Sequence, residues 1–198
     1  MTPDSHTQRK AKVYEAALAL TSQGVSPAAM TIQQLADAAG IGKGTVYEYF
    51  SSKEEILQGV ACYCFAQENE RIAARFDRCR TLVDLENELV DYLQEVAAQR
   101  MSTYRLLAVS FGQQTALSEC TDACRSQLTD LTDALVARLQ AAGEIDPGLT
   151  MDACRTSIFC TVTGGLIALC CSAGSGDALP DLPQNLRDNL HRSLRPQK

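Results

Sequence analysis

Residues 31–55 hold a group of side chains whose chemistry suits contact with a nucleic acid. Lysine ammonium groups and the hydroxyls of threonine and tyrosine donate hydrogen bonds to phosphate oxygens, and some of them can reach base edges in a groove. Such donors occur at Lys43, Thr45, Tyr47, Tyr49 and Lys53. Whether these donors form one surface depends on the helices that carry them.

The nine cysteines are a second group with possible chemistry. Cys120 and Cys124 are four residues apart on a predicted helix, so they would share a face and could bind a soft metal as thiolates. No CxxC or cysteine–histidine spacing of a zinc site occurs. We favour the interpretation that the cysteines are small buried hydrophobic residues, present as free thiols in a reducing cytoplasm. A thiol or soft-metal sensor is the alternative; we expect no cofactor and no resident metal.

Enzymatic chemistry finds no support in the sequence. No phosphate-binding loop, dinucleotide fingerprint or nucleophile elbow occurs, and only two histidines are present, His6 and His191. His191 lies near the end of the last predicted helix, where it suits the helix dipole better than catalysis. We therefore expect that the protein is not an enzyme.

The donors of residues 31–55 need a rigid element to position them. Thr31 followed by Gln34 is a capping box, which predicts that a helix begins there. Gly40 suits the left-handed residue that ends this helix, and Ile41 would be an apolar plug inside the turn.

A second helix is predicted from about Lys43 to Tyr49, with Val46 and Phe50 facing inward. Ser52 with Glu55 is another capping box, which opens the following helix. Two short helices joined by a glycine turn form a helix-turn-helix, a unit that places its second helix in the major groove of DNA.

The stretch IGKGTVYEYFSSKEEIL resembles the recognition-helix signature of the tetracycline-repressor (TetR) family, and the resemblance extends from about Val13 to Leu57. One departure is Gly42, where the family often has a serine as N-cap. Glycine is tolerated there at a cost of roughly a few tenths of a kcal/mol. Beyond Leu57 the resemblance is limited to length and helical pattern, in the half that binds the ligand in this family.

The resemblance implies DNA contacts residue by residue. Tyr47 and Lys53 would bind phosphates, and Thr31 and Thr45 would do so through their hydroxyls. Gly44 would matter because the absence of a side chain lets backbone and DNA come close. The residues expected nearest the base edges are Lys43, Gly44, Thr45 and Tyr49.

The charge distribution is compatible with DNA binding although the 198-residue chain has a net charge of −6. Residues 1–53 contain five Lys/Arg and four Asp/Glu, net +1, which leaves thirteen basic and twenty acidic residues, net −7, in residues 54–198. Arg9, Lys10 and Lys12 cluster just before the first predicted helix. A local basic footprint is what phosphate contact needs, not a basic protein.

The helical pattern continues through the chain, and no segment shows strand alternation. We predict an all-α protein with a helix-turn-helix DNA-binding domain over residues 1–55 and a ligand-binding and dimerisation domain over residues 56–198. The expected helices span about 7–23, 32–39, 43–49, 52–75, 82–98, 103–114, 118–142, 150–172 and 184–194, with a loop over 173–183.

The most apolar stretch, Ile158 to Ala173, is too short and too interrupted for a membrane span, and no signal peptide is visible. We expect this helix and the last one to form a homodimer interface, with Gly164 and Gly165 allowing close approach of another helix.

A small, mostly apolar effector is expected between the helices that follow the DNA-binding domain. The candidate pocket residues are Cys64, Phe65, Tyr92, Met101, Tyr104, Phe111 and Phe159.

Taken together, the sequence predicts a cytoplasmic, homodimeric repressor that a small molecule releases from a palindromic DNA operator. Alternatives are an activator of transcription, a thiol- or metal-sensing regulator, and a helical interaction protein that does not bind DNA.

Overall fold

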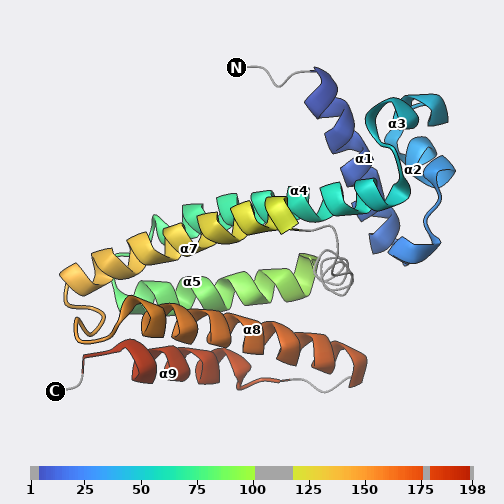
Figure 1. Ribbon diagram of the computed structural model, residues 1–198. Coiled ribbons are helices and arrows are strands. Elements are labelled where there is room, and N and C mark those ends of the chain that lie inside the picture. Colours follow the sequence, from blue (N-terminus) through green and yellow to red (C-terminus); the bar gives the residue numbers. More distant parts are fainter. Residues whose placement is uncertain (1–4, 101–117, 176–178, 197–198) are drawn as a thin grey trace. The chain divides into compact units, whose positions relative to one another are not determined.

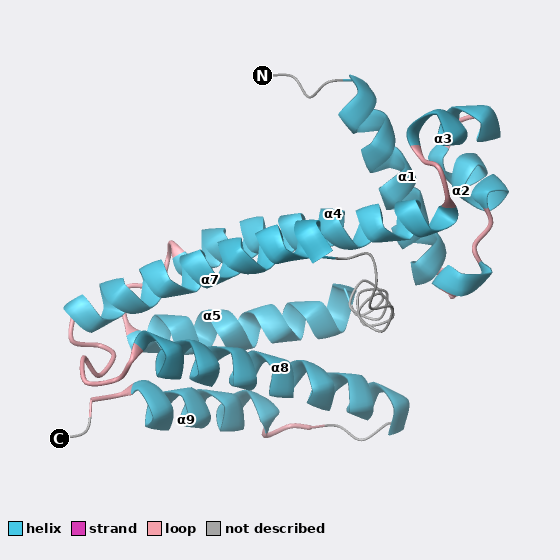
Figure 2. Cartoon of the chain, in the orientation of Figure 1, coloured by secondary structure: helices cyan, strands magenta, loops and turns pink. Residues whose placement is uncertain are grey.

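The computed structural model describes residues 5–100, 118–175 and 179–196. Every regular element in these ranges is a helix and none is a strand (Figure 2), so the all-α prediction is confirmed. The chain divides into two compact units: Met1–Glu68 with Ser102–Cys124, and Asn69–Met101 with Arg125–Lys198. The division falls within one helix, α4 (Lys53–Phe76), whereas the expected domain boundary was residue 55.

The first unit is built from short helices around one apolar core. It contains α1 (Ser5–Ser22), the 3-10 turn η1 (Pro27–Ala29), α2 (Ile32–Ala39), α3 (Lys43–Tyr49) and the first part of α4 (Figure 1). The buried core residues are Val13, Ala17, Met30, Leu35, Ala36, Val46, Phe50, Ile56, Val60, Ala61 and Cys64. Because this core includes residues of α1, α2, α3 and α4, it holds α3 in a set orientation on the other three helices.

The second unit packs longer helices. It contains the end of α4, α5 (Leu82–Glu95), the π-helical turn η2 (Val96–Arg100), most of α7 (Ser118–Ala141), α8 (Met151–Ser175) and α9 (Leu182–Leu194). Helices α5, α8 and α9 contact one another. The guanidinium of Arg138 on α7 donates to the carbonyl oxygens of Phe76 and Cys79, at 2.6 and 3.2 Å, and so ties α7 to the turn between α4 and α5.

Several helix ends differ from their predicted positions. The helix expected over 82–98 is α-helical only to Glu95, and η2 follows it. Helix α8 continues to Ser175, into the segment that we expected to be a loop, and α9 begins at Leu182 rather than at residue 184. The helix expected over 103–114 lies outside the described residues.

The two neighbouring glycines of α8 have different surroundings. A Cβ atom on Gly165 would lie 2.7 Å from Leu93 Cδ1 and 3.2 Å from Leu186 Cδ1, whereas a Cβ atom on Gly164 would have no neighbour within 4 Å. Gly165 therefore lets α5 and α9 pack closely on α8 inside one subunit. The expectation that both glycines serve contact with a second subunit is therefore wrong for Gly165. Adjacent residues of a helix point about 100° apart, so Gly164 can face away from the subunit while Gly165 faces into it.

None of the helices that the structure describes combines the length and apolar composition needed to cross a bilayer.

Candidate functional site

The turn between α2 and α3 is determined by local hydrogen bonds. The Thr31 hydroxyl accepts from the Gln34 backbone N–H at 3.2 Å, and the Gln34 side chain accepts from the Thr31 N–H at 2.9 Å, which confirms the predicted capping box. Gly40 has φ 67° and ψ 32°, the left-handed conformation that glycine adopts without strain, and the Ile41 N–H donates to the Ala36 carbonyl. These contacts define where α2 ends and in which direction α3 begins.

Helix α3 has an inward and an outward face. Val46 is fully buried and Phe50, the residue after the helix, is 3% exposed. The N-cap residue Gly42 provides no side-chain hydrogen bond, as expected for a glycine. The exposed residues of the helix are Lys43, Gly44, Tyr47 and Glu48, while Thr45 and Tyr49 are half-buried. Lys43, Gly44 and Tyr47 thus form one outward face, with the Tyr47 side chain 54% exposed.

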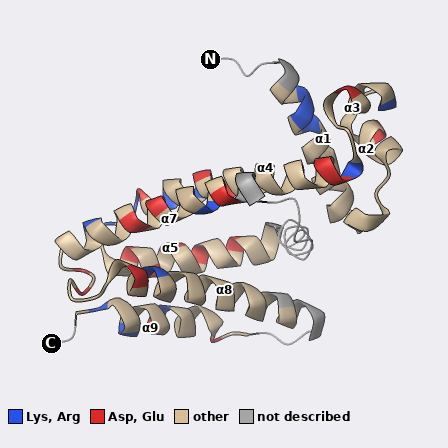
Figure 3. Ribbon diagram, viewed as in Figure 1, with Lys and Arg blue, Asp and Glu red and all other residues tan. Residues whose placement is uncertain are grey.

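Two basic residues of α1 lie against the end of α3. The Arg9 guanidinium donates to the Tyr49 hydroxyl at 3.0 Å, and the Lys10 ammonium lies 5.3 Å from the centre of the Phe50 ring. The sequence showed these cations as a cluster before the first helix, but they lie within α1 (Figure 3). Because Arg9 and Tyr49 are forty residues apart, no local pattern predicted this contact.

The start of α4 is held by three contacts. The Ser52 hydroxyl accepts from the Glu55 N–H at 3.1 Å, and the Glu55 carboxylate accepts from the Ser51 N–H at 2.7 Å, one residue earlier than in the predicted box. The Lys53 ammonium donates to the Ala28 carbonyl at 2.8 Å. Lys53 therefore bridges α4 and η1.

An aromatic cluster fixes α1 to α4. The Tyr14 ring lies 5.6 Å from the Phe50 ring and 5.5 Å from the Tyr63 ring, measured between centroids. Gly59 makes room for it, because a Cβ atom there would lie 2.6 Å from Tyr14 Cζ. Burial, and then the charge of Glu55, raises the pKa of the Tyr14 phenol, so this hydroxyl stays protonated.

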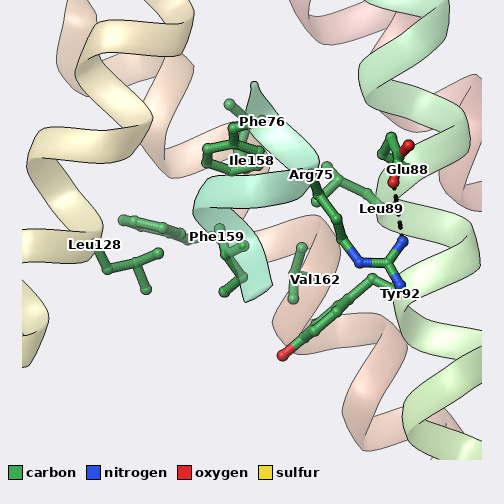
Figure 4. A pocket seen from close by; sticks show the side chains of 10 residues that line it. Arg75, Phe76, Glu88, Leu89, Tyr92, Leu128, Ile158, Phe159 and Val162 are labelled. Carbon is green, nitrogen blue, oxygen red and sulfur yellow. Dashed lines mark hydrogen bonds and ion pairs between the residues drawn. The ribbon is translucent and has the colours of Figure 1, made fainter. Parts of the chain in front are cut away.

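The second unit contains an apolar cavity of about 60 Å³ (Figure 4). Helices α4, α5, α7 and α8 contribute its walls. The residues that line it are Ile72, Arg75, Phe76, Glu88, Leu89, Tyr92, Leu128, Ile158, Phe159 and Val162.

One wall of this cavity is charged but internally paired. The Arg75 guanidinium binds the Glu88 carboxylate at 2.9 Å, also binds Glu95, and lies 5.7 Å from the centre of the Tyr92 ring. Arg78 binds the same Glu88 carboxylate at 2.7 Å. Hydrogen bonds from Arg78, and to a smaller degree from Arg75, hold the pKa of Glu88 below its usual range, so this carboxylate stays ionised near neutral pH.

The structure separates the candidate pocket residues. Tyr92 and Phe159 line the cavity, on α5 and α8. Cys64 is buried in the core of the first unit and Phe65 packs against that core, and neither is among the described residues that line this cavity. Helical periodicity shows that a residue is buried but not which core it joins. Met101, Tyr104 and Phe111 lie outside the described residues.

The cysteines are not uniform. Cys62 is disulfide-bonded, so the expectation of free thiols throughout is wrong for this residue. Burial raises the pKa of the Cys124 thiol, and burial together with the charges of Glu88 and Asp84 raises the pKa of Cys79 to about 11. Such thiols are protonated near neutral pH, which disfavours attack on electrophiles. Of the predicted pair, the Cys120 side chain lies outside the described residues.

His191 has a packing role. Its Nδ1 lies 2.8 Å from the buried Glu86 carboxylate, and Arg195 Nη1 lies 3.0 Å from its Nε2. Both ring nitrogens therefore have neighbours on α5 and beyond the end of α9. No group of three or more potential metal ligands occurs among the described residues.

Comparison with known proteins identifies the first unit. Residues 13–60 match the model of the family described as "Bacterial regulatory proteins, tetR family". The "HTH-type transcriptional repressor KstR" of Mycobacterium tuberculosis is 25% identical over 142 residues, covering 71% of this chain and 62% of KstR. The aligned region thus spans less than two thirds of that relative.

Solved structures share the fold along the whole chain. A putative TetR-family transcriptional regulator from Mesorhizobium loti has a TM-score of 0.76 at 16% identity, covering 96% of each chain. The transcriptional regulator FadR from Bacillus subtilis, in complex with stearoyl-CoA, has a TM-score of 0.72 at 18% identity, covering 94% of this chain and 98% of FadR.

Proposed function

The chain belongs to the TetR family of bacterial regulators, and from this premise we propose that it is a transcriptional repressor whose hold on a DNA operator is released by a small molecule. The observation that carries the proposal is the outward face of α3, which presents polar groups and a bare backbone on a helix anchored by Val46 and Phe50. A recognition helix needs this combination of a fixed inner face and an accessible outer one.

The residues of this surface divide into two roles. Tyr47 and Lys53 donate to phosphates, which positions the protein without reading sequence. The Thr45 hydroxyl does likewise, as does that of Thr31 once it exchanges its hydrogen bond to Gln34 Oε1 for one to a phosphate oxygen. Arg9 supports the Tyr49 hydroxyl at the same end of α3. The residues that approach base edges are Lys43, Gly44, Thr45 and Tyr49.

We assign the operator two symmetric half-sites because the protein acts as a homodimer. Small or apolar residues of α8 that recur at spacings of three and four lie on one exposed face of the helix. Ile167, on this face, is 59% exposed. The exposed positions are Ala153, Thr156, Cys160, Gly164, Ile167 and Cys171. A second copy of this chain covers the face, and the two recognition helices then require half-sites about 34 Å apart or a multiple of that distance.

The effector occupies the cavity of the second unit. FadR, of the same fold, was solved in complex with stearoyl-CoA, which supports a small-molecule site in a protein of this architecture. Helix α4 begins with Lys53 and ends with cavity residues Ile72 and Phe76. A ligand that favours a position of α4 unsuited to the operator weakens DNA binding by linkage.

The protein works in the cytoplasm, where the chromosome lies.

Operator binding tests the proposal directly. Fluorescence anisotropy with DNA flanking the protein's own gene should give a specific, salt-dependent complex. Lys53→Ala and Tyr47→Phe should weaken binding to operator and random DNA alike, whereas Lys43→Ala and Thr45→Ala should also reduce the ratio between the two. Arg192→Ala, an exposed cation on α9, is the control and should change neither. An operator affinity that is unchanged by Lys53→Ala at moderate salt would refute the docking model.

Gly44 offers a sharper test, because DNA contact and helix stability make opposite demands on it. A Cβ atom at Gly44 meets no atom within 4 Å, so Gly44→Ala should stabilise α3 by about 0.5–1 kcal/mol. The same methyl group should weaken operator binding if the backbone approaches DNA closely. A variant with raised thermal stability and unchanged operator affinity would place this backbone away from the DNA.

The alternatives predict different outcomes. A thiol sensor would lose induction, but not DNA binding, when Cys120 and Cys124 are both changed to serine. A helical interaction protein would bind no DNA fragment in these assays.

A further inference from the structure

We propose that the cavity of the second unit accepts an uncharged, hydrocarbon-rich ligand and discriminates against ligands with a carboxylate or other ionised group. This inference deepens the proposed function, since it names the chemical class of the effector. It rests on the described residues that line the cavity and on the way the charged ones among them are paired.

The lining offers hydrocarbon to a ligand on most sides. Aliphatic and phenyl side chains come from four helices, with Ile72 and Phe76 on α4, Leu128 on α7 and Phe159 on α8. Burying an ionised group among such side chains without a partner costs several kcal/mol or shifts the group to its neutral form. An uncharged apolar body, by contrast, gains about 25 cal/mol for each Å² that it removes from water.

The charged wall does not offset that cost. Of the described residues that line the cavity, Arg75 and Glu88 carry charged side chains, and they bind each other at 2.9 Å. Arg75 also binds Glu95 and stacks on Tyr92, and Arg78 adds a second cation to Glu88. Two guanidinium groups therefore face two carboxylates. An anionic ligand would have to displace a carboxylate from Arg75, and a cationic ligand would have to displace a guanidinium from Glu88.

The small volume of the cavity means that its walls must move when a ring compound binds. Its volume of about 60 Å³ is smaller than the roughly 150 Å³ of an engineered apolar cavity that binds benzene. A ligand with one or two rings must therefore push the walls apart. Two of the side chains that it would push, Ile72 and Phe76, lie one turn apart on α4, which connects this site to the DNA-binding unit.

Matched pairs of compounds test the ligand class without DNA. The probes are toluene with benzoate and naphthalene with 2-naphthoate, measured on the full chain by thermal unfolding and isothermal titration. We expect the neutral member of at least one pair to raise the unfolding midpoint and to bind at least tenfold more tightly than its carboxylate. The proposal is overturned if neither neutral compound binds, or if a carboxylate binds as tightly as its neutral partner.

Two variants locate the binding. Val162→Phe should fill the cavity and weaken naphthalene binding at least tenfold, while Val83→Phe, at a 52% exposed position of α5, should leave it unchanged. If Val162→Phe fails to fold, Leu128→Phe fills the same space from α7. If both cavity variants fold and bind naphthalene normally, the site lies elsewhere and the proposal fails.

The role of Arg75 is tested separately. Should 2-naphthoate bind more tightly than naphthalene and lose this advantage in Arg75→Met, the guanidinium is an anion receptor and the proposal is wrong. Failure of this inference is distinct from failure of the proposed function. If the protein binds its operator but not naphthalene, the proposed DNA-binding function stands and the proposed ligand class is wrong. If it binds naphthalene but not an operator, the ligand class stands and the proposed function is wrong.

Discussion

In the first unit part of the polar surface at the candidate site faces solvent, whereas in the second unit the charged side chains described at the cavity bind each other. Lys43 and Tyr47 are exposed on the outer face of α3. Arg75 and Glu88, in contrast, form an ion pair whose side chains are only 16% and 20% exposed. Outward donors can exchange water for phosphate oxygens at small cost, while paired inward charges leave hydrocarbon as the surface that a ligand meets.

The two units also derive their rigidity differently. Two helices of seven and eight residues, joined at a left-handed glycine, shape the candidate DNA surface of the first. Long helices packed by large apolar side chains shape the second. Backbone changes in the turn between α2 and α3 should therefore act on DNA recognition, and changes of side-chain volume at the cavity should act on ligand binding.

The largest expected effect comes from opening a cavity in each core. Leu35 and Leu139 are both fully buried, the first in the DNA-binding unit and the second in the effector unit. Leu35→Ala and Leu139→Ala should each cost about 2–5 kcal/mol. Hydrogen exchange followed by mass spectrometry should show faster exchange mainly in the unit that carries the change. Equal loosening of both units by either variant would contradict the comparison.

The adjacent glycines of α8 provide the next largest effect. Gly165→Leu should overpack the contact with Leu93 and Leu186 and cost about 1–3 kcal/mol or more. Gly164→Leu should leave the subunit folded and shift the dimer toward monomer. Thermal unfolding and analytical ultracentrifugation separate the two results. A stable Gly164→Leu dimer would move the interface away from this face of α8.

Two matched capping boxes give a smaller and more selective effect. Thr31 caps α2 in the first unit, and Thr81 caps α5 in the second with the same pair of contacts. Alanine at either position should lower the free energy of unfolding by about 1 kcal/mol. Only Thr31→Ala should also weaken operator binding, because its hydroxyl is a proposed phosphate donor. If Thr81→Ala weakens operator binding as much, the effect of Thr31→Ala is on stability alone.

The smallest effect concerns acid pH. The pKa of Glu88 is lowered in the folded protein, so its contribution to stability is present above the unfolded carboxylate pKa of about 4.3 and is lost as the pH falls through the folded value. Unfolding midpoints measured from about pH 7 to pH 3 should therefore fall less steeply for Glu88→Gln than for the wild type. Identical slopes would mean that the pairs with Arg75 and Arg78 add nothing to stability.

Much of the first unit could be predicted because its determinants are close in sequence. The Thr31 and Gln34 caps, the Gly40 turn and the bounds of α3 depend on residues at most a few positions apart, and the structure agrees with each. The resemblance of residues 13–57 to a known family led to the same unit.

The cavity and its charged wall could not be predicted in this way. Arg75, Glu88 and Phe159 meet only because α4, α5 and α8 pack together, and apolar periodicity placed Cys64 and Phe65 with them when they belong to another core. The Arg9–Tyr49 contact and the inward position of Gly165 could not be predicted either, because both depend on packing between helices that are far apart in sequence.

The sequence by itself thus determined roughly where most of the described helices lie, which residues cap α2 and α4, and which short helix has polar groups on its outer face. Backbone hydrogen bonds and turn conformations depend on near neighbours, and these can be read along the chain. Only the tertiary structure decided which buried side chains share a core, which charges neutralise each other and what space is left between helices. Such contacts join residues far apart in sequence, and their energies depend on how all the helices pack at once.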